Sequence, residues 1–320
     1  MMARRIWSWY GWGRPEWKRP DSFARSQASS RPGRSGVLQS RGMSSSLQNI
    51  YFRILQVRNG VDFPLRQIFR WRRPGLVFPN QPKDNLFAGM EESARSQAEE
   101  QARRLLQTYK LQALYSASTR DNYLENLYYL DLLEQALDRI GASLPPVIAA
   151  ADIGPSHWFY VQALYALLQW RDCPAGRQVE LSGFEADPYR VYADLRSRWD
   201  HAQTHMRGLQ GVQLYPHGFR QQPRKFDLIT MLFPFVFLED HLKWGLPGAL
   251  FDPDELLCRA WASLKPGGIL VIVNQGEKEH LAQNRRLQQS GIQPLAAYEH
   301  HSLLYHYDIP RYVLAASRSA

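Results

Sequence analysis

The sequence has few cysteines and no long apolar run. Only Cys173 and Cys258 occur in 320 residues, and they lie far apart, which excludes a disulfide-rich scaffold and favours a reducing compartment. No run reaches the roughly 18 apolar residues that a membrane-spanning helix needs. Glycines, prolines and charges interrupt the N-terminus, so it lacks the apolar core of a signal peptide. We therefore expect a cytoplasmic protein with no membrane span.

Negative charge is scarce at the N-terminus, where residues 1–42 hold nine basic and two acidic side chains. Their net charge of +7 leaves +2 of the total +9 for residues 43–320. A tail rich in Ser, Arg, Gly and Pro cannot bury enough apolar surface to fold alone. The tail can bind RNA, DNA or anionic lipid, or it can simply be solvated. Alternatively, translation begins at Met43 and the tail is not made. We expect nucleic-acid binding only through this tail, if at all.

Composition and patterning divide the chain into four segments. Residues 1–42 are expected to be a disordered tail, and 43–85, with Pro64, Pro79 and Pro82, an irregular segment. Residues 86–145 are expected to form a helical cap. Residues 146–320 are expected to form one α/β domain, in which no internal repeat is apparent.

The cap contains two expected helices, over 91–114 and 121–140. The first is rich in strong helix formers, and leucines spaced by three and four give the second an apolar face. Ser118 or Thr119 can cap the start of the second helix, and Gly141 stands where a left-handed C-cap is wanted.

Short apolar runs and helical patterns alternate in the rest of the chain. Asp252 and Pro253 mark the start of one helix clearly. Such alternation indicates a mostly parallel sheet covered by helices on both faces. The expected strands are 147–152, 179–184, 212–215, 226–233, 269–273, 293–300 and 312–316, and the expected helices are 156–171, 189–205, 251–264 and 281–290.

The residues after each strand are the candidates for a binding site, because ligands of open parallel sheets bind beyond the carboxyl ends of the strands. The first strand runs into a strand-to-helix turn, which aims free backbone N–H groups at a ligand. Glu185 follows the second strand, and a carboxylate can accept hydrogen bonds from both hydroxyls of a ribose. Phe233, after the fourth strand, can wall an apolar slot. The pattern predicts a nucleotide-like cofactor.

Four motifs occur in order: DIGPS at 152–156, GFEADP at 183–188, KFDLITMLF at 225–233 and LKPGGILVIV at 264–273. With this order and spacing, residues 146–320 resemble the class I S-adenosylmethionine-dependent methyltransferases. The resemblance implies a doubly wound, seven-stranded Rossmann-like α/β fold with strand order 3-2-1-4-5-7-6 and the seventh strand antiparallel. It also implies S-adenosylmethionine as cofactor and methyl transfer to an acceptor, which we expect to be a small molecule.

The resemblance also assigns roles to residues. The loop after the first strand would approach the amino acid part of the cofactor, Glu185 the ribose, and His217 and Phe219 the adenine. The resulting cofactor-binding set is Asp152, Gly154, Pro155, Ser156, Glu185, Asp187, His217, Phe219 and Phe233.

The loop departs from the Gly-x-Gly-x-Gly pattern of the family, since it reads Gly154-Pro155-Ser156-His157-Trp158. A catalytically inactive protein of the same fold, acting as a binding or scaffold module, is therefore an alternative function. A nicotinamide-dependent enzyme is a weaker alternative, because no G-x-G-x-x-G follows the first strand.

Methyl transfer requires mainly positioning, because the sulfonium is already activated. A general base is needed only when the acceptor carries a proton at attack. Candidates are His157, Glu239, Asp240 and His241, although solvated or capping roles are the commoner explanation for such residues.

The remaining candidates are a possible metal site and several side chains of the expected core. His201 and His205 are spaced for zinc but lack the accompanying glutamate, and His300, His301 and His306 lie near one another in sequence; we expect no metal site. Cys258 is expected in the core. The tyrosines at 123, 128 and 129 either pack in the core or line an acceptor pocket. The oligomeric state is not predicted.

Overall fold

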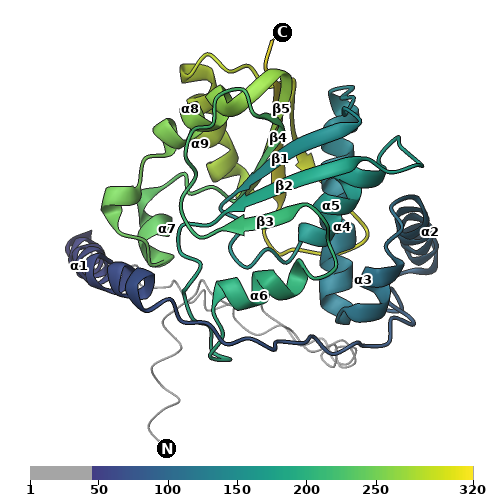
Figure 1. Cartoon of the computed structure of the whole chain (residues 1–320), viewed down its shortest axis with the longest axis horizontal. Coiled ribbons are helices and arrows are strands. Elements are labelled where there is room, and N and C mark those ends of the chain that lie inside the picture. The colour runs from purple at the N-terminus through teal and green to yellow at the C-terminus, as the bar shows by residue number, and fades with distance from the viewer. Residues whose placement is uncertain (1–44, 320) are drawn as a thin grey trace, which may run out of the picture.

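A computed structural model describes residues 45–319, so the predicted tail at 1–42 and Met43 lie outside the described residues. A seven-stranded sheet forms its centre, with helices on both faces (Figure 1). Among the described residues, no helix has the length and apolar character needed to cross a membrane.

The strand order is β3-β2-β1-β4-β5-β7-β6. The first five strands are parallel, and β7 is antiparallel to both β5 and β6. This order and this single antiparallel strand are those implied by the resemblance, so the predicted Rossmann-like fold class is confirmed. The strands are β1 (Val147–Ile153), β2 (Gln178–Phe184), β3 (Val212–Tyr215), β4 (Phe226–Leu232), β5 (Leu264–Gln275), β6 (Ala296–His300) and β7 (Arg311–Ser317).

Helices cover the sheet in two layers, with α4 and α5 on one face and α8 and α9 on the other. A strand sends alternate side chains to opposite faces, and β5 follows this rule. Val271 and Val273 join the core under α4 and α5, whereas Leu270 and Ile272 join the core under α8 and α9. The helices are α1 (Ser45–Phe69), α2 (Glu92–Thr108), α3 (Gln112–Ala117), α4 (Arg120–Arg139), α5 (Val161–Trp170), α6 (Arg198–His205), α7 (Leu238–Lys243), α8 (Pro253–Ser263) and α9 (Gly276–Gln289).

Local capping signals were predicted correctly. The Thr119 hydroxyl accepts a hydrogen bond from the Asn122 N–H at the start of α4, and Gly141 is left-handed just past its end. Asp252 caps α8 by accepting from the Glu255 N–H.

The irregular structure expected over 43–85 is wrong for its first half, where α1 runs for 25 residues with Pro64 inside it. Contacts with α7 hold α1 in place. Leu55 is buried, and the Asn59 amide donates to the carbonyls of Leu242 and Leu246 over 2.7 and 3.0 Å. Residues 70–83 have no regular structure, as expected.

Other predicted helices differ in length. The helix predicted over 91–114 breaks between α2 and α3, where Lys110 is left-handed, and α9 begins five residues earlier than predicted. The helix predicted over 189–205 begins only at α6, because Ser197 and Asp200 form a reciprocal capping box there. The helix predicted over 156–171 is helical only in α5, since a loop occupies 156–160.

The placement of Cys258 in the core is also wrong, because its side chain is exposed. Leu257 and Ala260 carry the buried face of α8. Cys258 lies one residue further round the helix, so it points outward.

Candidate functional site

Three strands end beside one another at the candidate site. Asp152, near the end of β1, pairs in register with Gly183 of β2 and Thr230 of β4. Glu185 and Phe233 directly follow β2 and β4. The structure therefore brings the residues predicted after the first, second and fourth strands to one edge of the sheet.

In the loop between β1 and α5, every second residue from Gly154 to Trp158 has a left-handed backbone. Gly154, Ser156 and Trp158 are all left-handed, with φ of 73°, 57° and 53°. Their spacing is that of the three glycines in the Gly-x-Gly-x-Gly loops of the methyltransferase family that the sequence resembles. Left-handed backbone costs a residue with a Cβ roughly 1–2 kcal/mol. The loop thus has left-handed backbone at the three positions where the Gly-x-Gly-x-Gly pattern has glycine, although two of these residues carry side chains.

The side chain of Trp158 compensates for this strain. It is fully buried, and its indole Nε1 donates to Asp152 Oδ2 over 2.7 Å. Its ring packs on Gly183, where an added Cβ would lie only 2.7 Å from the ring. Gly183 therefore makes the room that Trp158 occupies.

Asp152 is enclosed by the protein. Its second oxygen, Oδ1, accepts from the Thr230 hydroxyl over 2.8 Å. Burial raises the pKa of Asp152 to about 6, against the effect of these hydrogen bonds. In this structure Asp152 fixes the loop to β1 and β4, and its predicted contact with a cofactor stays a prediction.

Glu185 joins the loop to the end of β2. Its Oε2 accepts from the Ser156 N–H and its Oε1 from the Asp187 N–H, both over 2.8 Å. Arg198 of α6 approaches the same carboxylate, with Nη1 3.5 Å from Oε1. Glu185 is only 4% exposed, so each of these contacts is made away from water.

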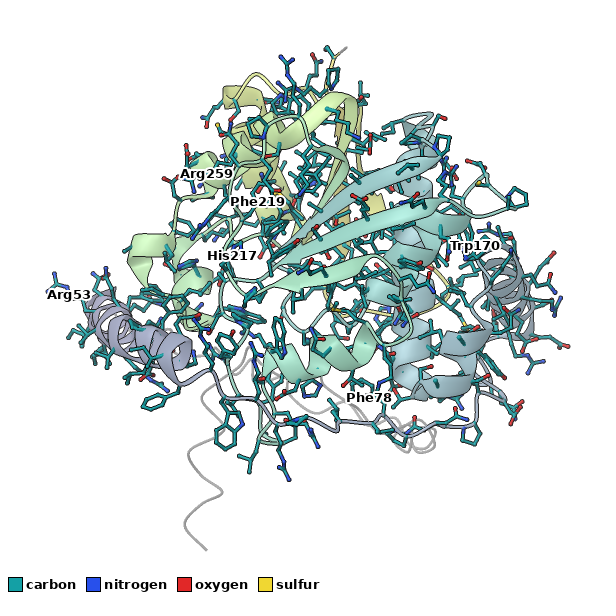
Figure 2. All side chains as sticks on the ribbon, in the orientation of Figure 1. Arg53, Phe78, Trp170, His217, Phe219 and Arg259 are labelled. Carbon is teal, nitrogen blue, oxygen red and sulfur yellow. The ribbon has the colours of Figure 1, made fainter. Side chains whose placement is uncertain are left out.

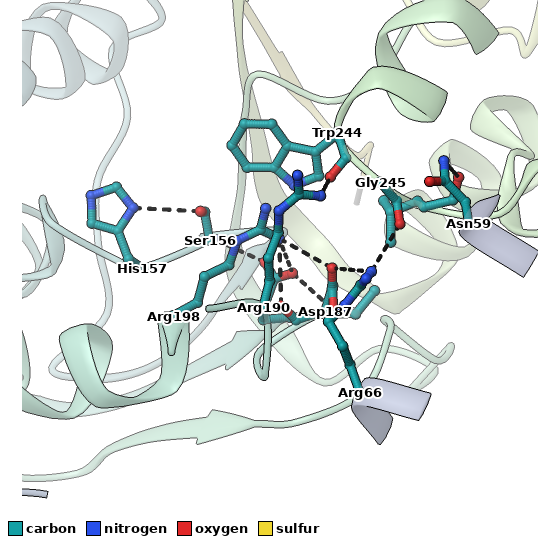
Figure 3. A network of polar contacts seen from close by, with 12 residues as sticks. Asn59, Arg66, Ser156, His157, Asp187, Arg190, Arg198, Trp244 and Gly245 are labelled. Carbon is teal, nitrogen blue, oxygen red and sulfur yellow. Dashed lines mark hydrogen bonds and ion pairs between the residues drawn. The ribbon is translucent and has the colours of Figure 1, made fainter. Parts of the chain in front are cut away.

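Arg66, Arg190 and Arg198 lie around Asp187 (Figure 3), and Arg198 also approaches Glu185. Arg66 of α1 binds Asp187 with two hydrogen bonds of 2.9 Å, and Asp187 is fully buried. The Arg198 guanidinium lies 4.3 Å from the centre of the Trp244 ring, and the Trp244 carbonyl accepts a hydrogen bond from Arg190. Burial lowers the pKa of Arg190 to about 10.

The sequence analysis missed these arginines. Arg66 comes from a helix that was not predicted, and Arg198 begins a helix whose start was predicted nine residues too early. Each reaches the acids through the fold rather than through a local motif.

Three histidines lie beside the loop. The ring of His157 stacks on Phe159, and its centre lies 6.2 Å from those of His201 and His205. His205 is buried, and Phe78 stacks over it at 4.6 Å. Burial lowers the pKa of His157 to about 3, so it is a weak base at neutral pH. Among the described residues, no cluster of His, Cys, Asp or Glu is arranged to hold a metal ion.

The residues predicted near the adenine lie after β3. His217 is half-buried beside Tyr215 and Phe184, and its Nδ1 lies 2.9 Å from the Gly218 carbonyl oxygen. Phe219 is instead part of the core, with its ring at right angles to Phe184. Pro155, in the loop, is buried as well.

Two of the three candidate bases of α7 have structural contacts. Glu239 is exposed, Asp240 pairs with Lys243 at 3.6 Å, and His241 lies 3.0 Å from the Pro247 carbonyl oxygen. Their catalytic role stays a prediction.

A second polar group lies on the α4 side of the sheet, and the sequence analysis missed it. The Tyr307 hydroxyl donates to Glu125 over 3.1 Å, and Arg311 lies 4.0 Å from the Tyr307 ring centre and 4.9 Å from that of Phe233. Burial raises the pKa of Glu125 to about 7. The tyrosines at 123, 128 and 129 are all buried nearby in the core.

Phe233 has a left-handed backbone, with φ of 59°. Its ring centre lies 6.2 Å from that of Tyr129, whose ring in turn lies 5.4 Å from Phe159 in the loop after β1. These rings connect the second polar group to the loop.

Solved structures with a similar fold include methyltransferases and a cyclase. A SAM-dependent methyltransferase from Aquifex aeolicus is 16% identical over 61% of this chain and 96% of its own, with a TM-score of 0.40. The [4+2]-cyclase SpnF is 13% identical over 59% and 80%, with a TM-score of 0.42. A methyltransferase from Pyrococcus furiosus is 17% identical over 61% and 85%, with a TM-score of 0.38. No family model and no curated protein matches the sequence.

Replacing Gly183 by alanine tests the packing of Trp158. The new Cβ would meet the indole ring at 2.7 Å, so we expect the free energy of unfolding to fall by about 1–3 kcal/mol in urea denaturation. Gly218→Ala is the matched control, because its Cβ would meet nothing closer than 3.9 Å. Equal effects of the two substitutions would contradict the role given to Gly183.

The buried histidines predict a loss of stability in acid. Burial holds the pKa of His205 well below its usual value, so the folded state keeps it neutral while the unfolded chain takes up a proton below about pH 6.5. The free energy of unfolding should then fall by about 1.4 kcal/mol per pH unit below that point for such a residue.

Urea denaturation of His205→Phe between about pH 7 and pH 5 measures this effect. The variant should lose about 1 kcal/mol less per pH unit than the wild type. His306→Phe is the control, because that side chain is 89% exposed. Parallel pH curves for the wild type and His205→Phe would show that burial of this ring does not depress its pKa.

Proposed function

We propose that the domain over residues 146–320 binds S-adenosylmethionine at the carboxyl ends of β1 and β2 and transfers its methyl group to a small-molecule acceptor. The observation that carries the proposal is the loop at 154–158, which has left-handed backbone at the three positions where the Gly-x-Gly-x-Gly pattern has glycine, beside the buried carboxylate of Glu185.

The residues at this edge fit the cofactor in two respects. Gly154 is exposed, and an added Cβ there would meet no atom within 4 Å, so the outer side of the loop is open to a ligand. A carboxylate has about four lone-pair sites, and the Ser156 N–H, the Asp187 N–H and Arg198 use three of those on Glu185. The remaining site, on Oε2, can accept one hydroxyl of a ribose.

The acceptor is proposed to bind on the side of Phe233 and Glu125. Aromatic rings from α4, the loop after β1 and the segment before β7 suit an apolar molecule. Arg311 Nε is buried without a hydrogen-bond partner, so a polar group of the acceptor can satisfy it.

Glu125 is the base that we propose for an acceptor that carries a proton. Burial raises the pKa of its carboxyl group to about 7, and a general base works best when its pKa lies near the working pH. The cofactor supplies an activated methyl group, and the chain positions the acceptor and takes the proton. The low cysteine content supports action in a reducing compartment, which we propose to be the cytoplasm.

One observation favours the alternative of an inactive scaffold. The Ser156 N–H, which a glycine loop would offer to a ligand, donates instead to Glu185, and Arg198 approaches the same carboxylate. In that case the protein closes the site with its own groups, and only the fold is kept.

Calorimetric titration with S-adenosylmethionine and its demethylated product tests the proposal. The wild type should bind both, and Glu185→Gln should weaken binding at least tenfold, because the carboxylate proposed to accept a ribose hydroxyl is lost. Glu180→Gln is the matched control, since this exposed residue lies on the same strand and should change affinity less than twofold.

Thermal denaturation with and without ligand checks that each variant is folded. Absence of both heat and thermal shift for the wild type at millimolar ligand would overturn the methyltransferase proposal in favour of the scaffold. Unchanged affinity in a folded Glu185→Gln would remove Glu185 from the site.

A further inference from the structure

Helix α1 turns an apolar face to solvent along its whole length. Seven large aliphatic side chains recur at spacings of three and four, each between 44% and 72% exposed. We call them the α1 stripe. Contiguous exposed apolar surface of this kind marks an interaction site in soluble proteins. The α1 stripe consists of Leu47, Ile50, Ile54, Val57, Val61, Leu65 and Ile68.

The opposite side of α1 holds the helix on the body of the protein. Leu55 and Asn59 are buried there. Asn59 donates to carbonyls at and just beyond the C-terminal end of α7, and Arg66 donates to Asp187. At 100° per residue these positions lie roughly opposite the stripe. The α1 stripe is therefore not needed to attach α1. It is exposed because the contacts on the opposite side fix the orientation of the helix.

Basic and aromatic residues border the stripe. Arg53 projects from the outer side of α1, away from the body (Figure 2). The helix ends at exposed Phe69, and the exposed residues Arg70 and Trp71 follow it. Residues 45–73 contain six arginines and one acid, and residues 1–42 add a net charge of +7 immediately before them.

We propose that α1 is an interfacial helix that lays the α1 stripe on an anionic lipid surface. An apolar face bordered by arginines and aromatics suits the boundary between headgroups and acyl chains. Anionic headgroups attract the basic residues on either side of it.

Charge distinguishes this partner from two others. A second copy would bring two such basic segments against each other, and like charges across an interface repel. The phosphates of RNA would attract the arginines beside the stripe, but they would leave the aliphatic side chains of the stripe exposed to water. A lipid surface satisfies both the charge and the apolar face.

Flotation of the full-length protein with vesicles tests the proposal. Vesicles of phosphatidylcholine with about one third phosphatidylglycerol should bind it at least tenfold more tightly than phosphatidylcholine alone. Val57→Ser/Val61→Ser should lower binding to the anionic vesicles at least tenfold, since both side chains are exposed in the stripe. The matched control, Leu281→Ser/Leu295→Ser, replaces two exposed aliphatic residues elsewhere and should bind like the wild type.

A second variant, Arg53→Glu/Arg70→Glu, should weaken binding to anionic vesicles and leave binding to neutral ones unchanged. Failure of the wild type to bind anionic vesicles would overturn the proposal, as would equal binding by the stripe and control variants. Lipid-free dimerisation that Val57→Ser/Val61→Ser abolishes, seen in sedimentation velocity, would instead assign the α1 stripe to a second copy.

Discussion

The carboxylate of Glu185 connects the parts of this structure that local sequence does not connect. One of its oxygens holds the loop after β1 through Ser156, and the other holds the turn that presents Asp187. Asp187 in turn receives Arg66 from α1. A buried carboxylate without such donors is strongly unfavourable, so the loop, the end of β2 and the N-terminal helix each depend on the others for their placement.

The loop at 154–158 shows that residues other than glycine can adopt the left-handed backbone expected at the glycine positions of a motif. Two left-handed positions carry Ser156 and Trp158, and the strain is offset by hydrogen bonds and by burial of the indole against Gly183. The strained conformation therefore depends on Asp152 and Gly183, which lie outside the loop's own pattern. Strain of this kind concentrates at ligand sites in other proteins.

Much of the fold follows from local patterns, whereas much of the site does not. Apolar runs predicted the strands, and Thr119 and Asp252 marked their helices, because capping is decided within one turn of chain. Helix α1 was missed because the contacts that hold it come from distant parts of the chain. Asn59, for example, donates to carbonyls 183 and 187 residues away. Glu125 and Tyr307 form a hydrogen bond although 182 residues separate them, and no periodicity in either segment predicts that contact. Glu185, predicted to bind the ribose, has partners within the protein that only the fold could supply, and its contact with a cofactor stays a prediction.

The ion pair between Arg66 and Asp187 makes α1 and the edge of the sheet parts of one equilibrium. A ligand that binds either of them and changes the strength of this pair changes the affinity of the other for its own partner by the same factor, because coupling free energies are reciprocal. Events at the outer surface of α1 and events at the carboxyl end of β2 are thus joined by two hydrogen bonds. Under the two proposals made above, a lipid surface bound by α1 and a ligand bound beside Glu185 would each change the affinity of the protein for the other.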